Sequence, residues 1–163
     1  MYDNKQNIKK DADDPKSEEV NQYVTFFVGD ETYGVSVMKV QSINEMIEIT
    51  HVPKARAFIK GVINLRGSVI PVIDMRKKFS LPPKDYDSFT VILIVEVNER
   101  LVGMIVDSVS DVIDIPVSDI QSQINYSARV DTSSIEGIGR IGERLVVLLD
   151  VETFLAGDSQ FEG

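Results

Sequence analysis

A chain of 163 residues is long enough for one ordinary domain, or for two very small ones that share a core. Hydrophobic residues make up 43% of it and charged residues 26%, a balance that predicts a packed globular protein and excludes a largely disordered one. The formal charge of -9 disfavours nucleic acid and anionic membrane surfaces as partners, because both carry negative charge.

The N-terminal third predicts a tail followed by a hairpin. Residues 1–21 are charged and nearly free of apolar side chains, so they are predicted to form a mobile tail. Residues 23–28 are apolar and β-prone, 29–32 are turn formers, and apolar residues alternate from Tyr33 to Val37, which indicates a β-hairpin. The spacing after Val37 fits helix and strand equally, and a single helical turn is expected there.

The middle of the chain predicts a second hairpin and a short helix. Residues 59–73 read as two strands around a tight turn at Asn64-Leu65-Arg66-Gly67. Asp74 follows the second strand and stands where the N-cap of a short helix through Lys77 or Phe79 would be. The Pro82-Pro83 pair closes this unit.

The C-terminal half repeats the scheme. Residues 89–97 form a β-prone run, 98–100 a turn, and 101–115 a long strand-like stretch. Short strands are predicted at 135–141 and 145–149, and Asp150 stands where a helix to Leu155 would begin.

Two internal similarities support a duplicated architecture. The residues from Gly61 to Asp74 match those from Gly137 to Asp150 at one constant offset, and 33–43 match 102–112 at another. Sheets built from a few short strands can avoid unpaired edge strands by closing into barrels. The sequence therefore predicts an all-β fold of two small β-barrels packed together, with short helices.

These patterns also set the expected boundaries. The folded domain is predicted to span 22–156, with halves at approximately 22–83 and 84–156, followed by a C-terminal tail at 157–163. The chain begins with Met1 and ends in a short, mostly polar segment from Gly157 to Gly163, and both features favour a complete chain.

The sequence lacks cysteines, a signal peptide and apolar segments long enough to span a membrane. The chain has no Cys, which excludes disulfides, thiolate metal sites and a Cys nucleophile and suits a reducing compartment. The N-terminus has no apolar segment of signal-peptide length, and the longest apolar runs, such as 91–95, are too short to span a membrane. A cytoplasmic protein without membrane insertion is expected.

The polar motifs do not assemble into a catalytic or metal site. The run Gly137 to Gly142 has the spacing of a dinucleotide-binding loop, but an apolar strand follows it where a helix would be needed, so a turn is favoured. His51 has no second imidazole or Ser-rich elbow near it and is interpreted as an exposed loop residue. Asp107, Asp111, Asp114 and Asp119 lack calcium-loop spacing and are interpreted as solvated acids. No catalytic, cofactor-binding or metal-binding residue is predicted.

Two groups of residues are candidate protein-binding surfaces. A concentration of positive charge is compatible with a patch for an acidic partner and equally with scattered solubilising charge; its members are Lys54, Arg56, Lys60, Arg66, Arg76, Lys77 and Lys78. Val109, Val112, Ile113 and Ile115 exceed what one buried strand face needs, so some of them are expected to line an exposed apolar groove, although buried core accounts for most.

Several segments resemble the CheW family of bacterial chemotaxis coupling proteins. They are Gly29-Asp30-Glu31-Thr32-Tyr33-Gly34-Val35, Val40-Gln41, Phe58 through Gly67, Ile70 through Asp74, Val102-Gly103, Val106 through Val112 and Gly137-Ile138-Gly139. The resemblance covers nearly everything from Tyr23 to Leu155. It implies a pair of five-stranded SH3-like barrels and a non-enzymatic adaptor without a cofactor. It also implies two partners, the regulatory domain of a CheA-type histidine kinase and the cytoplasmic tip of methyl-accepting chemoreceptors, at receptor arrays.

The resemblance also implies site residues. The turn Asn64-Leu65-Arg66-Gly67, with Gly61 and Val40, corresponds to positions important for kinase or receptor coupling. Val91, Val109 and Val112 correspond to apolar positions near a groove between the barrels that receives a receptor hairpin tip. The division between kinase and receptor surfaces stays open. Where the family commonly carries a Glu after Val-Gln, this chain has Ser42, so an ion pair of Arg66 must use another acid such as Glu45, or be absent.

Other functions remain open at this point. Within the family, the alternative is a coupling domain of a larger protein, such as a receiver-fused coupler or the regulatory domain of the kinase. A β-barrel that binds single-stranded nucleic acid is an alternative from another class, with Tyr23, Phe26, Phe27 and Tyr33 as its stacking aromatics, but the net charge has the wrong sign. An enzyme is disfavoured because the chain has no Cys, a single His and no phosphate-binding loop in the required context.

Overall fold

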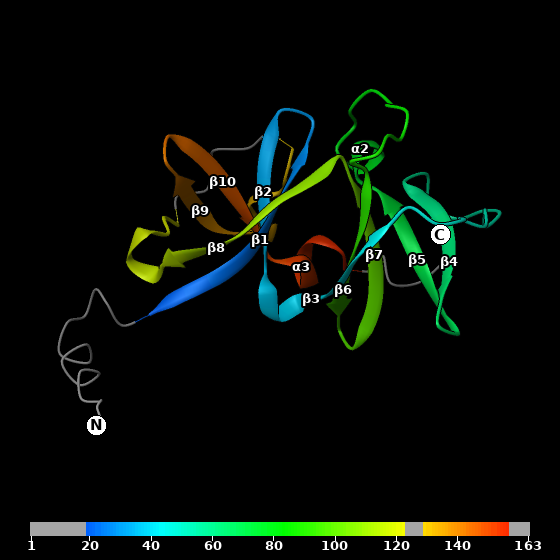
Figure 1. The fold of residues 1–163 in the computed structure, drawn as a ribbon, viewed down its shortest axis with the longest axis horizontal. Helices are drawn as coiled ribbons and strands as arrows, with labels where there is room; N and C mark the ends of the chain where they lie inside the picture. Colours follow the sequence, from blue (N-terminus) through cyan, green and yellow to red (C-terminus); the bar gives the residue numbers. More distant parts are fainter. Residues whose placement is uncertain (1–18, 123–128, 157–163) are drawn as a thin grey trace.

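The computed structural model describes residues 19–122 and 129–156 and confirms the all-β class. Two five-stranded sheets account for most of the fold (Figure 1). The first sheet has the spatial order β8 (Ser108–Pro116), β1 (Val20–Val28), β2 (Glu31–Ser36), β10 (Arg144–Leu149) and β9 (Ile135–Ile141). The second has the order β3 (Val40–Glu45), β6 (Val91–Val97), β7 (Arg100–Val106), β5 (Ser68–Asp74) and β4 (Ile59–Leu65).

The hairpins form where the sequence predicts them. β1 and β2 pair antiparallel around Gly29, β4 and β5 pair around Arg66 and Gly67, and β9 and β10 pair around Gly142. These turn residues have positive φ, the conformation that short hairpin loops require. Because β9 runs directly into the Gly142 turn and then into β10, the segment Gly137 to Gly142 is confirmed as strand and turn.

The strands are not divided between the sheets as the internal similarities suggest. The first sheet combines β1 and β2 with β8, β9 and β10, and two parallel pairings, β2 with β10 and β5 with β7, join distant parts of the chain. The two sheets therefore do not correspond one to one with the two sequence copies. The predicted strand 101–115 is likewise two strands, because the chain leaves the second sheet after β7, turns at Asp107 and enters the first sheet as β8.

Short helices are positioned by aspartate caps. Asp74 accepts hydrogen bonds from the backbone N–H groups of Arg76 and Lys77 and begins α2 (Met75–Lys78). Asp150 caps α3 (Val151–Phe154) in the same way. Since a side-chain oxygen satisfies N–H groups that the first helical turn leaves unpaired, both helices begin at the predicted residues. The single helical turn expected after Val37 is the 3-10 helix η1 (Val37–Lys39).

The two sheets pack on each other through a shared core. Its aromatic centre is a row of rings in which Tyr33 stacks on Phe26 at 5.8 Å and on Phe79 at 5.0 Å. Phe79 in turn contacts Phe154 of α3 at 5.7 Å, and Figure 1 shows α3 at the centre of the molecule. Phe26 and Tyr33 belong to the first sheet, whereas Phe79 follows α2 beside the second. Buried aromatic contacts of this kind hold the two halves of the molecule in one arrangement.

The ends of the predicted domain are only partly described. β1 begins at Val20, two residues before the predicted start at residue 22. Residues 1–18 and 157–163, where most of the two predicted tails fall, lie outside the described residues. Within the described part of the chain, no helix has the length and apolar character needed to cross a membrane.

Candidate protein-binding surfaces

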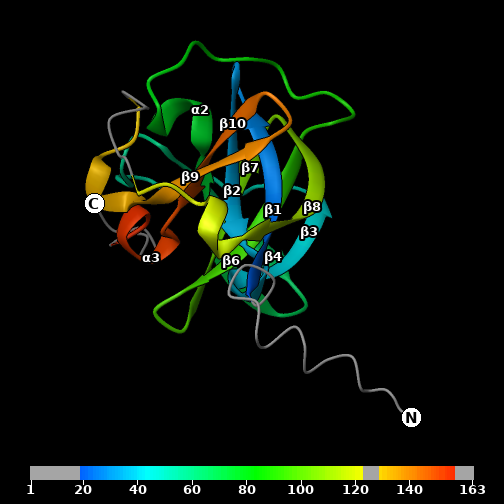
Figure 2. The ribbon, with the colours of Figure 1, turned by 90° about the vertical axis from the view of Figure 1, so that its left-hand side faces the viewer.

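The predicted site residues form two groups in the structure. Gly61, Asn64, Leu65, Arg66 and Gly67 belong to the β4–β5 hairpin of the second sheet. Val40, Val91, Val109 and Val112 lie on β3, β6 and β8. β3 and β8 are the edge strands of different sheets, and Figure 2 shows both along the same side of the molecule.

The tip of the β4–β5 hairpin is a rigid turn that exposes an arginine. Arg66 and Gly67 have φ values of 55° and 88°, and the side-chain oxygen of Asn64 accepts a hydrogen bond from the Gly67 N–H at 3.0 Å. A non-glycine residue in this region carries local strain, which is common at binding sites. The turn therefore holds the exposed Arg66 in a fixed place without help from a partner.

Arg66 has no ion-pair partner among the described residues. The expected alternative, Glu45, does not pair with it, and Ser42 accepts a hydrogen bond from the side-chain amide of Asn44 at 2.8 Å instead. The guanidinium group thus keeps its five donors for solvent or for a partner.

Gly61 has a packing role that the resemblance does not indicate. A Cβ atom at this position would lie 2.2 Å from the backbone oxygen of Thr50 and 2.8 Å from the Cγ2 of Ile49. Thr50 and Val62 form a β-bridge there, with two hydrogen bonds of 2.8 Å. Gly61 is therefore required for the 49–52 segment to approach β4.

The second group combines half-buried and exposed apolar side chains. Val40, Val91 and Val109 are half-buried against the shared core, whereas Val112 is 58% exposed. Of the other residues expected near a groove, Ile115 is buried and Ile113 packs beside it. Sequence reasoning missed Ile43 of β3, which is 45% exposed and is identified only by the alternating burial of that strand.

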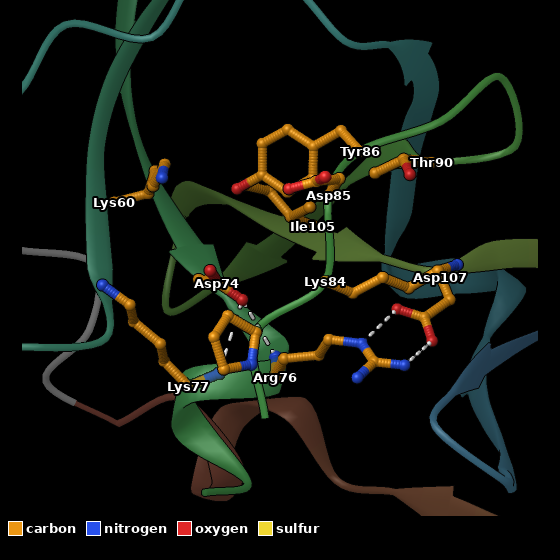
Figure 3. A pocket seen from close by; sticks show the side chains of 11 residues that line it. Lys60, Asp74, Arg76, Lys77, Lys84, Asp85, Tyr86, Thr90, Ile105 and Asp107 are labelled. Atoms are coloured by element: carbon orange, nitrogen blue, oxygen red, sulfur yellow. Dashed lines mark hydrogen bonds and ion pairs between the residues drawn. The ribbon is translucent and has the colours of Figure 1, made fainter. Parts of the chain in front are cut away.

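An ion pair joins the two sheets where the chain crosses between them. Arg76 of α2 donates to both carboxylate oxygens of Asp107, from Nε at 3.0 Å and from Nη2 at 2.8 Å (Figure 3). Asp107 also accepts from the Gly29 N–H at 2.9 Å, so one carboxylate contacts α2 and the β1–β2 turn. The interpretation of Asp107 as a solvated acid is wrong, because its side chain is only 17% exposed and paired.

The pKa of Asp107 reflects this environment. Burial acts to raise it, but the hydrogen bonds from Arg76 and from Gly29 outweigh burial and hold the pKa below its ordinary value of 3.8. A carboxyl whose pKa falls on folding stabilises the folded state above its unfolded pKa. That stabilisation disappears as the pH falls through the lower, folded value.

Asp107→Asn is expected to lower the free energy of unfolding by about 1.5–3 kcal/mol at pH 7, the range for a lost hydrogen bond to a charged group. The difference from the wild type should stay constant between about pH 7 and 5 and shrink below about pH 4, where the wild-type carboxylate takes up a proton. Urea unfolding at each pH measures it. Asp111→Asn, at an exposed residue of β8, is the control. A difference that is independent of pH down to pH 2 would contradict the role of the Asp107 charge.

The remaining polar candidates do not converge. His51 is exposed in a loop, as predicted. Among the described residues, no group of His, Cys, Asp or Glu is placed to hold a metal ion.

Comparisons with known proteins agree with this description. The model of the CheW-like domain family matches residues 22–159. The chain is 36% identical to chemotaxis protein CheW of Klebsiella aerogenes over 137 residues, which cover 84% of this chain and 82% of that protein. It is 38% identical to chemotaxis protein CheW of Bacillus subtilis over 136 residues, 83% of this chain and 87% of the relative.

A solved structure shares this fold. The crystal structure of the scaffolding protein TtCheW from Thermoanaerobacter tengcongensis superposes with a TM-score of 0.79 and 29% sequence identity. The match covers 88% of this chain and 97% of that one. The two five-stranded sheets therefore correspond to the pair of SH3-like barrels that the resemblance implies.

Proposed function

Because this chain belongs to the CheW family of chemotaxis scaffold proteins, we propose that it joins a CheA-type histidine kinase to methyl-accepting chemoreceptors and lets the receptors control the kinase. Its proposed contacts are the regulatory domain of the kinase and the cytoplasmic tip of the receptor. The proposed location is the cytoplasm, at membrane receptor arrays that it reaches through these partners.

The observation that carries the proposal is the separation of the two candidate surfaces. The exposed hairpin tip joins β4 and β5, whereas the apolar group lies on β8 of the first sheet and on β3 and β6, at the other end of the strand order of the second sheet. A scaffold must hold two partners at once, and surfaces on separate strands permit both to bind together. The rigid packing of the two sheets through Phe79 then fixes the geometry between the partners.

The hairpin tip suits a charged protein partner. Arg66 offers a forked donor in a fixed position, a geometry that matches a carboxylate through two parallel hydrogen bonds. The adjacent Gly67 has no heavy atom within 4 Å of the place of a Cβ, so a partner backbone can approach closely. Asn64 maintains the turn, because its side-chain oxygen accepts a hydrogen bond within the hairpin.

The apolar residues suit a helical partner. Exposed Val112 and Ile43, with half-buried Val40, Val91 and Val109, offer methyl groups beside the edges of β3 and β8. Apolar side chains at helical spacing on a receptor hairpin would bury this surface and remove it from water. We therefore assign the hairpin tip mainly to the kinase and the β3–β8 side mainly to the receptor.

The alternatives are less well supported. Three of the four aromatics needed for base stacking, Tyr23, Phe26 and Tyr33, are buried in the core and present no face to a strand of nucleic acid. The fourth, Phe27, is covered by Arg144, whose guanidinium carbon lies 5.1 Å from the ring centre. A coupling domain of a larger protein would use the same surfaces, so the proposed contacts with kinase and receptor would be unchanged.

Simultaneous binding tests the two-surface arrangement. A chain saturated with the kinase regulatory domain is expected to bind a receptor cytoplasmic fragment with an affinity within about twofold of that of the free chain. Analytical ultracentrifugation of the three-component mixture should then show a ternary complex. Strict competition between the two partners would contradict separate surfaces.

Arg66→Ala is expected to weaken binding of the kinase regulatory domain about tenfold, the range for one forked charged contact at an interface. The melting temperature should stay within about 1 °C, because an exposed turn-tip side chain carries little stability. Isothermal titration and thermal unfolding measure the two effects. Arg140→Ala, at an exposed arginine of β9, is the control. Loss of cooperative unfolding in the Arg66 variant would make this residue structural instead.

A further inference from the structure

Four cations surround one cavity that the coupling surfaces do not use. Lys54, Arg56 and Lys60, from the segment leading into β4, face Lys77 of α2 around a space of about 330 Å³. His51 and several aliphatic side chains complete the wall. No Asp or Glu from the described part of the chain lines it. In a protein of net charge -9, a cavity lined by four cations and by no acid from the described residues requires an explanation.

The other cations of the predicted basic patch do not line this cavity. Arg76 is bound by Asp107 and by the Pro82 carbonyl oxygen. Lys78 lies over the rings of Phe58 and Phe154, at 4.4 Å and 5.0 Å, and Arg66 is at the hairpin tip. Of the predicted patch, only Lys54, Arg56, Lys60 and Lys77 line this cavity, and we call them the basic cavity group.

A second cavity continues the first. It has a volume of about 570 Å³ and shares Lys60 and Lys77 with it, and Figure 3 shows these two side chains on the same side of the space. Two of its three carboxylates have structural partners, because Asp74 caps α2 and Asp107 holds Arg76. Tyr86 lines the same space, and burial, followed by the Asp74 charge, raises its pKa to about 12, so its hydroxyl keeps a proton to donate at neutral pH.

The size and exposure of the group indicate the kind of ligand. Each of the four cations is exposed, and a single exposed ion pair is worth less than about 1 kcal/mol. A small anion would therefore bind weakly, whereas a chain carrying several carboxylates adds these contacts together. Aliphatic wall residues such as Ile49 and Val52 would cover the methylene groups of glutamate side chains.

We propose that the two joined cavities bind an acidic peptide segment of a protein partner, with its carboxylates on the basic cavity group. Lys54 supports this assignment because its backbone has a φ of 65°, a strained conformation for a lysine that places its side chain at the cavity. The site is distinct from the hairpin tip and from the β3–β8 side, and it does not depend on either partner of the coupling reaction.

The probe for the test is a fluorescein-labelled octaglutamate peptide, with octaglutamine as the uncharged reference. Saturable binding is expected at low salt, with amide chemical-shift changes confined to residues 49–60, 74–78, 83–90 and 105–107, which line the two cavities. The double variant Lys54→Glu/Lys77→Glu should reduce the affinity about tenfold. The matched control Arg100→Glu/Arg140→Glu changes the net charge equally at exposed positions outside the cavities and should leave the affinity within about twofold.

Three results would overturn the proposal. The first is equal weakening by both double variants, which would mean that net charge alone governs binding. The second is a set of shifted amides outside the two cavities, or no saturable binding. The third is displacement of the peptide by an equal concentration of inorganic phosphate, which would identify a small-anion site instead.

Discussion

Replacing Gly61 by alanine is expected to lower the free energy of unfolding by at least about 3 kcal/mol, near the upper end of the effects of single substitutions. The added Cβ would meet the Thr50 backbone oxygen at 2.2 Å, and that oxygen belongs to a β-bridge held by two hydrogen bonds. Backbone atoms cannot move aside as a flexible side chain can. Relief of the clash therefore requires separation of the 49–52 segment from β4. Urea unfolding followed by circular dichroism measures the loss.

Gly67→Ala is the matched control. Gly67 also has a positive φ, of 88°, but nothing lies within 4 Å of the place of its Cβ. Only the backbone preference is lost there, which costs about 1 kcal/mol. Equal losses in the two variants would show that the Thr50 contact is not what requires a glycine at position 61. If the difference is found, a coupling defect in a Gly61 variant arises through the fold, whereas one in a Gly67 variant concerns the partner surface.

Val112→Asp is expected to weaken binding of a receptor cytoplasmic fragment by at least about 30-fold, which corresponds to about 2 kcal/mol for a central interface residue. The valine would be buried by the receptor, and an aspartate there would lose its hydration without gaining a partner. Because Val112 is 58% exposed on an edge strand, the free protein should lose less than about 1 kcal/mol of stability. Isothermal titration with the fragment gives the affinity.

Val20→Asp separates this effect from a general loss of apolar surface or a gain of negative charge. Val20 is 54% exposed at the start of β1, which lies in the first sheet with β8. Replacing it by aspartate adds the same negative charge as the Val112 substitution. Receptor binding should stay within about twofold in this variant. Unchanged receptor affinity in the Val112 variant would remove β8 from the proposed receptor surface.

The local parts of the fold could be predicted because their determinants are local. Turn residues between alternating apolar runs locate the hairpins, and Asp74 and Asp150 locate both helix starts through hydrogen bonds to N–H groups two and three residues away. The partition of strands between the sheets depends on pairings such as β2 with β10, which join residues far apart in the chain. An internal repeat indicates similar local structure, but it does not say which copies share a sheet.

The same contrast applies to the candidate sites. The exposed turn at Arg66 is recognisable from neighbouring residues, and a family resemblance draws attention to it. Asp107 gives no such signal, because the arginine that pairs with it is 31 positions away in α2 and its other contact is the Gly29 N–H. The need for Gly61 is equally hidden, since the clash that an alanine would cause is with Thr50 across a bridge. The basic residues between 54 and 78 resemble one patch in the sequence, yet the fold places Arg66 and Lys78 outside both cavities and pairs Arg76 with Asp107.

Isothermal titration of this chain with the regulatory domain of a CheA-type kinase, and separately with a receptor cytoplasmic fragment, tests the coupling function most directly. Saturable one-to-one binding to the kinase domain, together with measurable binding of the receptor fragment at moderate salt, is the predicted result. Absence of binding to both partners, by a chain that unfolds cooperatively, would contradict the proposed coupling of kinase and receptor.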